Sequence, residues 1–209
     1  MPQANAQPLC YAPRMGNRED LLRGAKACLL EKGYTRTTVR DIAAAAGVSM
    51  AAIGYHYGSR EALLNEAMFE AMGEWGASME QRVAEKLDAA ATPAERYEAL
   101  WTAVIDVFDE YRPLWLTTFE ALLVSEHDPE LRRQLAGGQR EGIRGVAAQL
   151  AGGGEDEVDD ATVRTIGAVH AALLTGLMSQ HLLDPDRAPD AGEVLAGLRA
   201  LGARAGGTG

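Results

Sequence analysis

The sequence predicts an all-α chain of about nine helices. Runs of β-branched and aromatic residues that would mark strands are nearly absent, while apolar residues recur at spacings of three and four. Helix start and stop signals bracket these periodic segments. With 209 residues, 47% of them hydrophobic and 24% charged, the chain can bury a real core, which excludes small disulfide scaffolds and disordered proteins.

Four helices are expected in the first part of the chain. Each begins at a residue whose side chain can accept a hydrogen bond from a free backbone N–H, and most end at a glycine. The second helix has a capping box made by Thr38 and Asp41. The expected ranges are 17–33, 38–47, 49–57 and 59–87, with Asn17, Thr38, Ser49 and Ser59 as the caps.

Five more helices are expected after residue 91. Thr92, Pro93 and Glu95 combine a cap, a proline in the first turn and a reciprocal glutamate, and start a helix that reaches about Tyr111. The other four are delimited by Pro113, by Asp128 with Pro129, by the glycines at 152–154, and by a box of Asp190 with Glu193; the last two span roughly 158–183 and 190–203. Residues 1–16 are predicted to be a flexible arm and 206–209 a frayed tail.

Charge is distributed unevenly along the chain. The net charge is −10, yet residues 1–62 hold eight Lys or Arg against five Asp or Glu, a balance of +3 that leaves −13 for the other 147 residues. Since exposed charges are screened beyond about 8 Å at physiological salt, an acidic body does not cancel a distant basic head. The asymmetry indicates two parts with two roles, which we place at residues 17–62 and 63–205.

The segment from Thr37 to Tyr57 has the length and turn of a helix-turn-helix. Gly47 suits the left-handed turn, Ala43 permits close approach of the two backbones, and Ile42, Val48 and Ile53 supply a small core. A glycine between two short helices also occurs in many helical bundles that bind no DNA. The residues predicted to face DNA on the second helix are Ser49, Met50, Ala51, Ala52, Gly54, Tyr55 and His56. The predicted phosphate anchors are Thr37, Thr38, Ser59 and Arg60, and Arg14 and Arg18 either follow the DNA backbone or enter a minor groove.

Residues 17–64 resemble the N-terminal DNA-binding region of the tetracycline-repressor (TetR) family. The resemblance is carried by EKGY at 31–34, TTVRDIAAAAGVS at 37–49, Tyr55 to Tyr57, and SREALL at 59–64. Met50, where the family often has a basic residue, and Gly54 in the recognition helix depart from the pattern. The resemblance implies that 17–62 is a DNA-binding domain and 63–205 a ligand-binding and dimerisation domain. It also implies a homodimer whose heads enter successive major grooves of a palindrome about 34 Å apart, commonly as a repressor that a small molecule releases.

The last two expected helices have broad apolar faces that contain small residues. Such faces can pair across a two-fold axis into a four-helix bundle, or they can simply cover the chain's own core. The predicted dimer interface consists of Thr165, Val169, Ala172, Leu173, Gly176, Leu177, Val194, Leu198 and Leu201.

Six of the twelve aromatic residues fall within 23 positions, from Tyr97 to Phe119. They either form a core of large side chains or line an apolar pocket for a partly hydrophobic effector, for which an acidic wall would favour a cation. The predicted pocket residues are Trp75, Met79, Trp101, Ile105, Phe108, Trp115, Thr118, Phe119, Leu122, His170 and Leu174.

Signatures of catalysis, cofactors and metals are missing from the sequence. His170 and His181 stand about 16 Å apart along one helix, and two cysteines, Cys10 and Cys28, cannot make a four-ligand zinc site. No phosphate loop or nucleophile elbow occurs, no apolar run approaches the 18 or so residues that span a bilayer, and the first 17 residues lack a secretory core. We expect a cytoplasmic, non-enzymatic DNA-binding regulator without cofactor or metal; the alternative is a regulator or interaction module without a small-molecule inducer.

Overall fold

The computed structural model describes residues 16–86 and 92–206, and within these two ranges it contains helices and turns but no strand. The predicted all-α class is therefore confirmed. The chain divides into two compact units, Met1–Ala67 and Met68–Gly209. Arg14, Cys10, Leu87 and the tail residues 207–209 lie outside the described residues.

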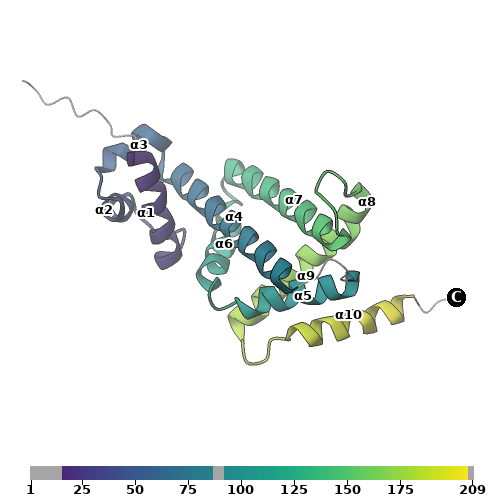
Figure 1. Ribbon diagram of the computed structural model, residues 1–209. Helices are drawn as coiled ribbons and strands as arrows, with labels where there is room; N and C mark the ends of the chain where they lie inside the picture. The colour runs from purple at the N-terminus through teal and green to yellow at the C-terminus, as the bar shows by residue number, and fades with distance from the viewer. Residues whose placement is uncertain (1–15, 87–91, 207–209) are drawn as a thin grey trace, which may run out of the picture. The chain divides into compact units, whose positions relative to one another are not determined.

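The first unit contains three helices and the start of a fourth (Figure 1). They are α1 (Gly16–Lys32), α2 (Val39–Ala46), α3 (Met50–Tyr57) and α4 (Arg60–Lys86), the last of which continues into the second unit. Their shared core is made of the fully or almost fully buried side chains of Leu21, Ala25, Cys28, Leu29, Ile42, Ile53, Leu63 and Leu64. Cys28 is thus the core residue that its place on the apolar stripe of the first helix indicates.

Local signals at the turns of this unit are mostly confirmed. The Thr38 and Asp41 capping box is formed, and Gly47 ends α2 at φ 67°, in the left-handed region that favours glycine. The Ser59 hydroxyl accepts a hydrogen bond from the Ala62 N–H at 3.0 Å. Ser49 is at the N-cap position of α3, as predicted, but its side chain makes no cap hydrogen bond. The predicted cap Asn17 is wrong, because Asn17 lies inside α1, which begins one residue earlier.

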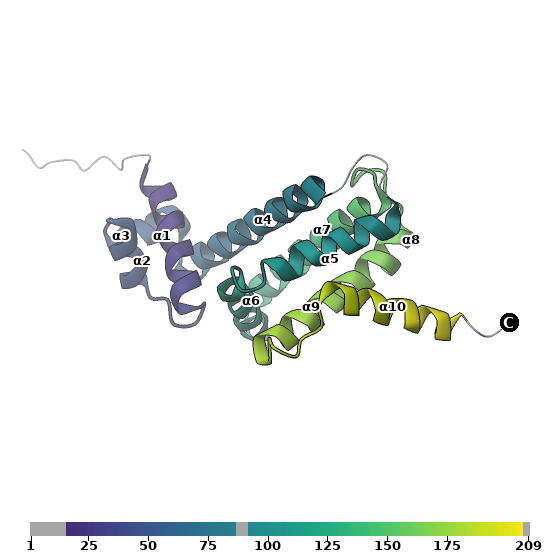
Figure 2. The ribbon, with the colours of Figure 1, turned by 60° about the horizontal axis from the view of Figure 1, so that its bottom comes forward.

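The second unit is built from the rest of α4 and the helices that follow. These are α5 (Pro93–Asp106), α6 (Arg112–Val124), α7 (Pro129–Ala151), α8 (Asp160–Thr162), the π-helical turn η1 (Val163–Gly167), α9 (Ala168–Leu183) and α10 (Ala191–Ala205). Figure 2 shows α10 beside α5 and α9. The fifth helix ends at Asp106, five residues before the predicted Tyr111, and hydrogen-bonded turns fill the interval.

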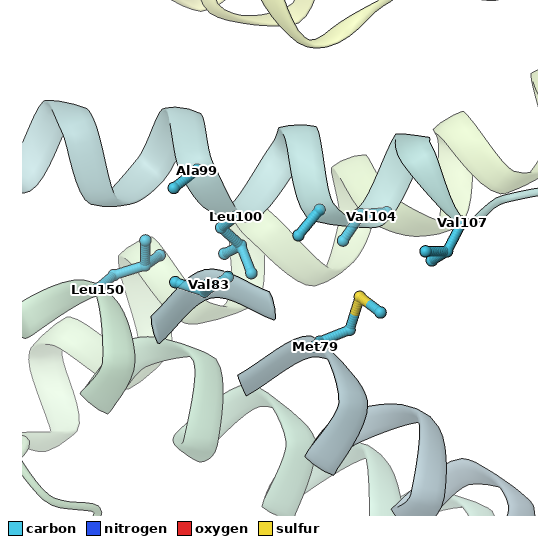
Figure 3. Close-up of a cluster of buried hydrophobic side chains, with 8 residues drawn as sticks. Met79, Val83, Ala99, Leu100, Val104, Val107 and Leu150 are labelled. Atoms are coloured by element: carbon cyan, nitrogen blue, oxygen red, sulfur yellow. The ribbon is translucent and has the colours of Figure 1, made fainter. Parts of the chain in front are cut away.

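Helices α4, α5 and α7 enclose an aliphatic core (Figure 3). Met79 and Val83 of α4 face Ala99, Leu100, Ala103, Val104 and Val107 around α5, and Leu150 of α7 completes the cluster. These buried branched and small side chains are closely spaced in sequence on each helix, as an amphipathic face requires. The cluster fixes α5 in place, and α5 carries Tyr97 and Trp101, two of the aromatic residues discussed below.

The predicted helix at 158–183 is interrupted by the π-helical turn η1. At Gly167 the backbone approaches α7 so closely that an added Cβ atom would lie 2.7 Å from the Ile143 carbonyl oxygen. Only a residue without a side chain fits there, which explains how η1 and α7 come into contact.

Helix Asp160–Leu183 is long and apolar enough to cross a membrane by length and composition, contrary to the expectation that no such run exists. One such helix is weak evidence for a membrane span, because the core helix of a soluble protein passes the same test. In this structure only 22% of its apolar stretch is buried.

Candidate functional sites

Helix α3 presents an exposed face of small and polar side chains. Tyr55 is 75% exposed, Met50, Ser49, Ala51 and Gly54 are also exposed, and Ala52 and His56 are half-buried. The Tyr55 and His56 rings meet edge to face with their centroids 4.9 Å apart. Ile53, on the opposite side, is buried and anchors the helix. An eight-residue helix with a large exposed ring and few bulky neighbours has the dimensions to enter a major groove about 12 Å wide.

Thr37 does not belong to the exposed surface, although the sequence placed it among the phosphate anchors. Its side chain is fully buried. The hydroxyl lies 2.8 Å from the Gly33 carbonyl oxygen and 3.1 Å from that of Cys28, both at the end of α1. The Thr37 side chain therefore holds the turn between α1 and α2 and is not available to a phosphate.

The start of α2 is fixed by a small polar network. The Thr38 N–H donates to Asp41 Oδ2 at 2.9 Å, the Asp41 N–H donates to Thr38 Oγ1 at 3.2 Å, and Lys32 Nζ lies 2.6 Å from Asp41 Oδ1. Hydrogen bonds from Lys32 and then Thr38 hold the pKa of the Asp41 carboxyl well below its usual range. Thr38 itself stays exposed.

Two arginines of the first unit are engaged with the protein itself. Arg60 donates to carbonyl oxygens of the turn between α1 and α2, and its side chain is only 20% exposed. Arg18 lies 2.6 Å from Glu66 and over the Tyr57 ring.

Two other cations, not among the predicted contacts, lie exposed next to the start of α2. Arg36 donates from Nε to the Lys32 carbonyl, and the Arg40 side chain makes no hydrogen bond or ion pair within the described ranges. Their positions just before and just inside α2 could have singled them out in the sequence, because phosphates bind near helix N-termini.

Aromatic rings form a seam between α5 and α9 in the second unit. Trp101 of α5 lies against His170 with centroids 4.7 Å apart, and Phe108, in the turn that follows α5, stacks on His181 at 4.5 Å. The rings of Tyr97, Tyr111, Trp115 and Trp75 extend this seam onto α6 and α4. The structure thus brings together the predicted residues Trp75, Trp101, Phe108, Trp115 and His170.

Four buried polar atoms of this seam have no hydrogen-bond partner within the described ranges: Nε1 of Trp75, Trp101 and Trp115, and Nδ1 of His170. Burial lowers the pKa of His170 to about 4, so its imidazole is neutral at pH 7. No Asp, Glu, Lys or Arg is among the buried residues of the part of the chain that the structure describes. Glu120 of α6 is half-buried, so an acidic wall that favours a cation stays a prediction.

The other predicted pocket residues differ in position, although Leu174 packs against both the Trp101 cluster and the aliphatic core. Met79 belongs to the aliphatic core of Figure 3, and the Thr118 hydroxyl donates to the Leu114 carbonyl at 2.9 Å. Leu122 is 54% exposed, so it lies outside any interior lining of a single chain. The half-buried members are Ile105, Phe119 and Leu174.

Helices α9 and α10 expose most of the predicted dimer residues. Val169 is 56% exposed, and Thr165, Ala172, Gly176 and Leu201 are exposed as well, while Leu173, Val194 and Leu198 are half-buried. Leu177 is misplaced in the prediction: it is buried with Trp101 and Leu195 in the chain's own core. Ile166 and Leu183, which the prediction omitted, are exposed beside this face.

No group of three or more His, Cys, Asp or Glu residues in the described ranges is arranged to hold a metal ion.

Two family descriptions match the chain. "Bacterial regulatory proteins, tetR family" matches residues 21–67, and "Tetracyclin repressor-like, C-terminal domain" matches residues 92–204, more than half of the chain.

Curated relatives are transcriptional regulators. The HTH-type transcriptional regulator BetI of Paraburkholderia phymatum is 26% identical over 83% of this chain and 87% of its own length. The HTH-type transcriptional repressor KstR2 of Mycobacterium tuberculosis is 31% identical over 45% of each chain.

Solved structures share the fold over nearly the whole length. A TetR-family regulator from a Rhodococcus species aligns with a TM-score of 0.66 at 22% identity, over 90% of this chain and 98% of that one. A transcriptional regulator from Streptomyces coelicolor aligns with a TM-score of 0.61 at 26% identity, over 92% and 99%. On its two matched regions, its helical fold and its helix-turn-helix, the chain belongs to the TetR family of DNA-binding transcriptional regulators.

Proposed function

We propose that the chain is a homodimeric repressor that binds a palindromic operator and is released by a small, partly hydrophobic ligand. The observation that carries the proposal is the exposed face of α3, where Tyr55 stands out from a surface of small residues. In this proposal Ser49 to Ala52, Gly54, Tyr55 and His56 read the major groove, and Thr38 and the start of α2 bind a phosphate. KstR2, a relative, is itself described as a repressor.

The proposed dimer uses the exposed side of α9 and α10. An apolar helix of which only 22% is buried exposes a surface that a second copy of the same helix can cover. Small residues on this side, Ala172 and Gly176, let two helices approach closely. We propose 17–62 as the DNA-binding domain and 63–205 as the part that pairs and binds the effector.

The proposed effector site is the aromatic seam between α5 and α9. Buried polar atoms without partners are uncommon in folded proteins, and each leaves a hydrogen bond that a ligand or an enclosed water can make. Because α4 contributes Trp75 to this seam and also begins in the first unit, a ligand that shifts α4 changes the spacing of the two heads.

A regulator without a small-molecule inducer is the second candidate. This candidate is favoured by the aromatic rings, because they pack against one another and fill the interior that a ligand would occupy. The ring centroids of Trp75 and Trp115, for example, are 4.8 Å apart. In either case the protein acts in the cytoplasm on double-stranded DNA and catalyses no reaction.

The test is selection of bound duplexes from a random pool by the purified chain, repeated with metabolite extracts present. We expect a palindromic consensus, salt-sensitive binding and loss of binding by the double variant Tyr55→Ala, His56→Ala. Equal affinity for all sequences, or full binding by the double variant, contradicts the DNA-reading role. Operator affinity that no extract changes favours the second candidate.

A further inference from the structure

We infer that Arg60 is a positioning residue that holds the start of α2 through the turn before it, and not a ligand of a DNA phosphate. The inference rests on the proposed function, in which the first turn of α2 lies against the DNA backbone. It reverses the role that the sequence gives to Arg60, the first residue of α4.

The contacts of the guanidinium account for most of its donors. Nε donates to the Thr37 carbonyl, and Nη2 lies 2.6 Å from the Tyr34 carbonyl oxygen and 3.4 Å from that of Thr35. Nη1 pairs with Glu61 at 2.9 Å. Arginine has five N–H donors, so four of them have acceptors within the protein. A phosphate would have to compete for a side chain that is already bonded and largely covered.

The three carbonyls belong to the turn that leads into α2. Thr37 precedes Thr38, the N-cap of α2, and the Thr37 hydroxyl ties the same turn to the end of α1. Arg60 therefore links the first residue of α4 to the backbone that sets where α2 begins. A shorter or differently shaped donor group at this position leaves carbonyls of the turn unpaired.

Arg40 offers a matched contrast on the same surface. It is the second residue of α2, is exposed, and has no partner within the described ranges. If the start of α2 meets the DNA backbone, Arg40 is placed to neutralise a phosphate, whereas Arg60 acts only through geometry. The two arginines should differ in how their loss changes the salt dependence of binding.

The experiment measures the dissociation constant for the selected duplex over a range of salt for Arg60→Lys, Arg60→Gln and Arg40→Gln. A lysine keeps the charge but cannot bridge the three carbonyls, because its N–H donors all lie on one nitrogen and those of a guanidinium are spread over three. We expect both Arg60 variants to bind about tenfold more weakly with the parent's salt slope. Arg40→Gln should reduce the slope by about one per head.

Two further readouts separate positioning from a general loss of stability. Amide hydrogen exchange should quicken in Thr35 to Asp41 of Arg60→Lys, with the buried core of α1 unchanged. The affinity losses of Arg60→Lys and Thr38→Ala should also add up to more than the loss of the double variant, since both act through the start of α2.

Near-parent binding by Arg60→Lys together with a reduced slope for Arg60→Gln would overturn the inference and make Arg60 a phosphate ligand. Parent-like binding by both Arg60 variants, or additive losses with Thr38→Ala, also contradicts it. If the unsubstituted chain binds no duplex, the proposed function fails, and the exchange measurement still decides whether Arg60 positions α2.

Discussion

The two units of this protein differ in how completely their buried polar groups are hydrogen-bonded within a single chain. In the first unit, the buried Thr37 hydroxyl has backbone acceptors, and Tyr34 Oη donates to Asn65 Oδ1 at 2.6 Å. In the second, Nε1 of Trp101 and Nδ1 of His170 are buried without hydrogen-bond partners in the described part of the chain. Unpaired buried polar atoms cost stability, so the second unit contains sites that another molecule can complete.

The surfaces of the two units differ in the same direction. The first exposes Tyr55 among small residues, a surface suited to a polar groove. The second exposes large apolar side chains, Ile166 on η1 and Val169 and Leu183 on α9. The comparison indicates that one chain supplies the hydrogen-bond partners of the buried polar groups named above in the DNA-binding unit. In the proposed function, a second copy of the chain covers the exposed side of α9 and α10, and a ligand pairs with the buried polar atoms of the aromatic seam.

The largest expected effect comes from placing a charge on the exposed face of α9. Ala172→Glu should make the chain monomeric at micromolar concentration, because a buried carboxylate opposes pairing of two such faces. Operator affinity should fall by about 100-fold or more, since the two half-sites are then bound independently. Sedimentation and DNA titration measure both effects.

Ala94→Glu is the matched control for this variant. It adds the same side chain at an exposed position in the first turn of α5, where an acidic residue is favourable. It should stay dimeric and bind normally. A dimeric Ala172→Glu with parent-like affinity would remove α9 from the interface.

The next effect concerns the neutral, buried His170. Its pKa is about 4 in the folded protein against about 6.5 when unfolded, so the unfolded state takes up a proton first as the pH falls. Its contribution to stability is thus present above about pH 6.5 and is lost progressively down to about pH 4, roughly 3 kcal/mol in all.

His170→Phe keeps a ring against Trp101 but removes the titration. Urea unfolding at several pH values should show a parent curve that falls more steeply toward acid than that of the variant. If the stabilities of the parent and the variant change in parallel with pH, His170 is hydrated or hydrogen-bonded in solution, which would contradict its burial without a partner.

The smallest effect tests the close approach of η1 to α7. Gly167→Ala places a Cβ 2.7 Å from the Ile143 carbonyl oxygen and should lower the free energy of unfolding by about 1–3 kcal/mol. Gly142→Ala on α7, where nothing lies within 4 Å of the added atom, should instead be neutral or stabilising. Equal effects of the two substitutions would show that the contact at η1 is loose.

Signals confined to a few neighbouring residues predicted this fold well. The capping boxes at Thr38, Thr92 and Asp190 and the left-handed Gly47 are local, and all are formed. What the sequence missed depends on distant partners. The inward placement of Leu177 needs α5 and α10, the burial of Thr37 needs the end of α1, and the π turn at Gly167 needs α7.

The candidate site follows the same rule. The exposed face of α3 is a matter of helical periodicity and could be read from the residues. The engagement of Arg60 could not, because its acceptors are backbone carbonyls more than 20 residues away. Any residue type can supply a backbone carbonyl, so the sequence does not distinguish an arginine that donates to backbone carbonyls from one that is free to bind a phosphate.

The most direct test of the account inserts about five base pairs, half a helical turn, at the centre of the selected palindrome. The insertion turns the two half-sites to opposite faces of the duplex. A dimer whose DNA-binding units are held at a fixed spacing by the paired second units then cannot bind both half-sites. The account predicts that the dissociation constant rises by about 100-fold or more, to that of an isolated half-site. An unchanged dissociation constant would contradict it.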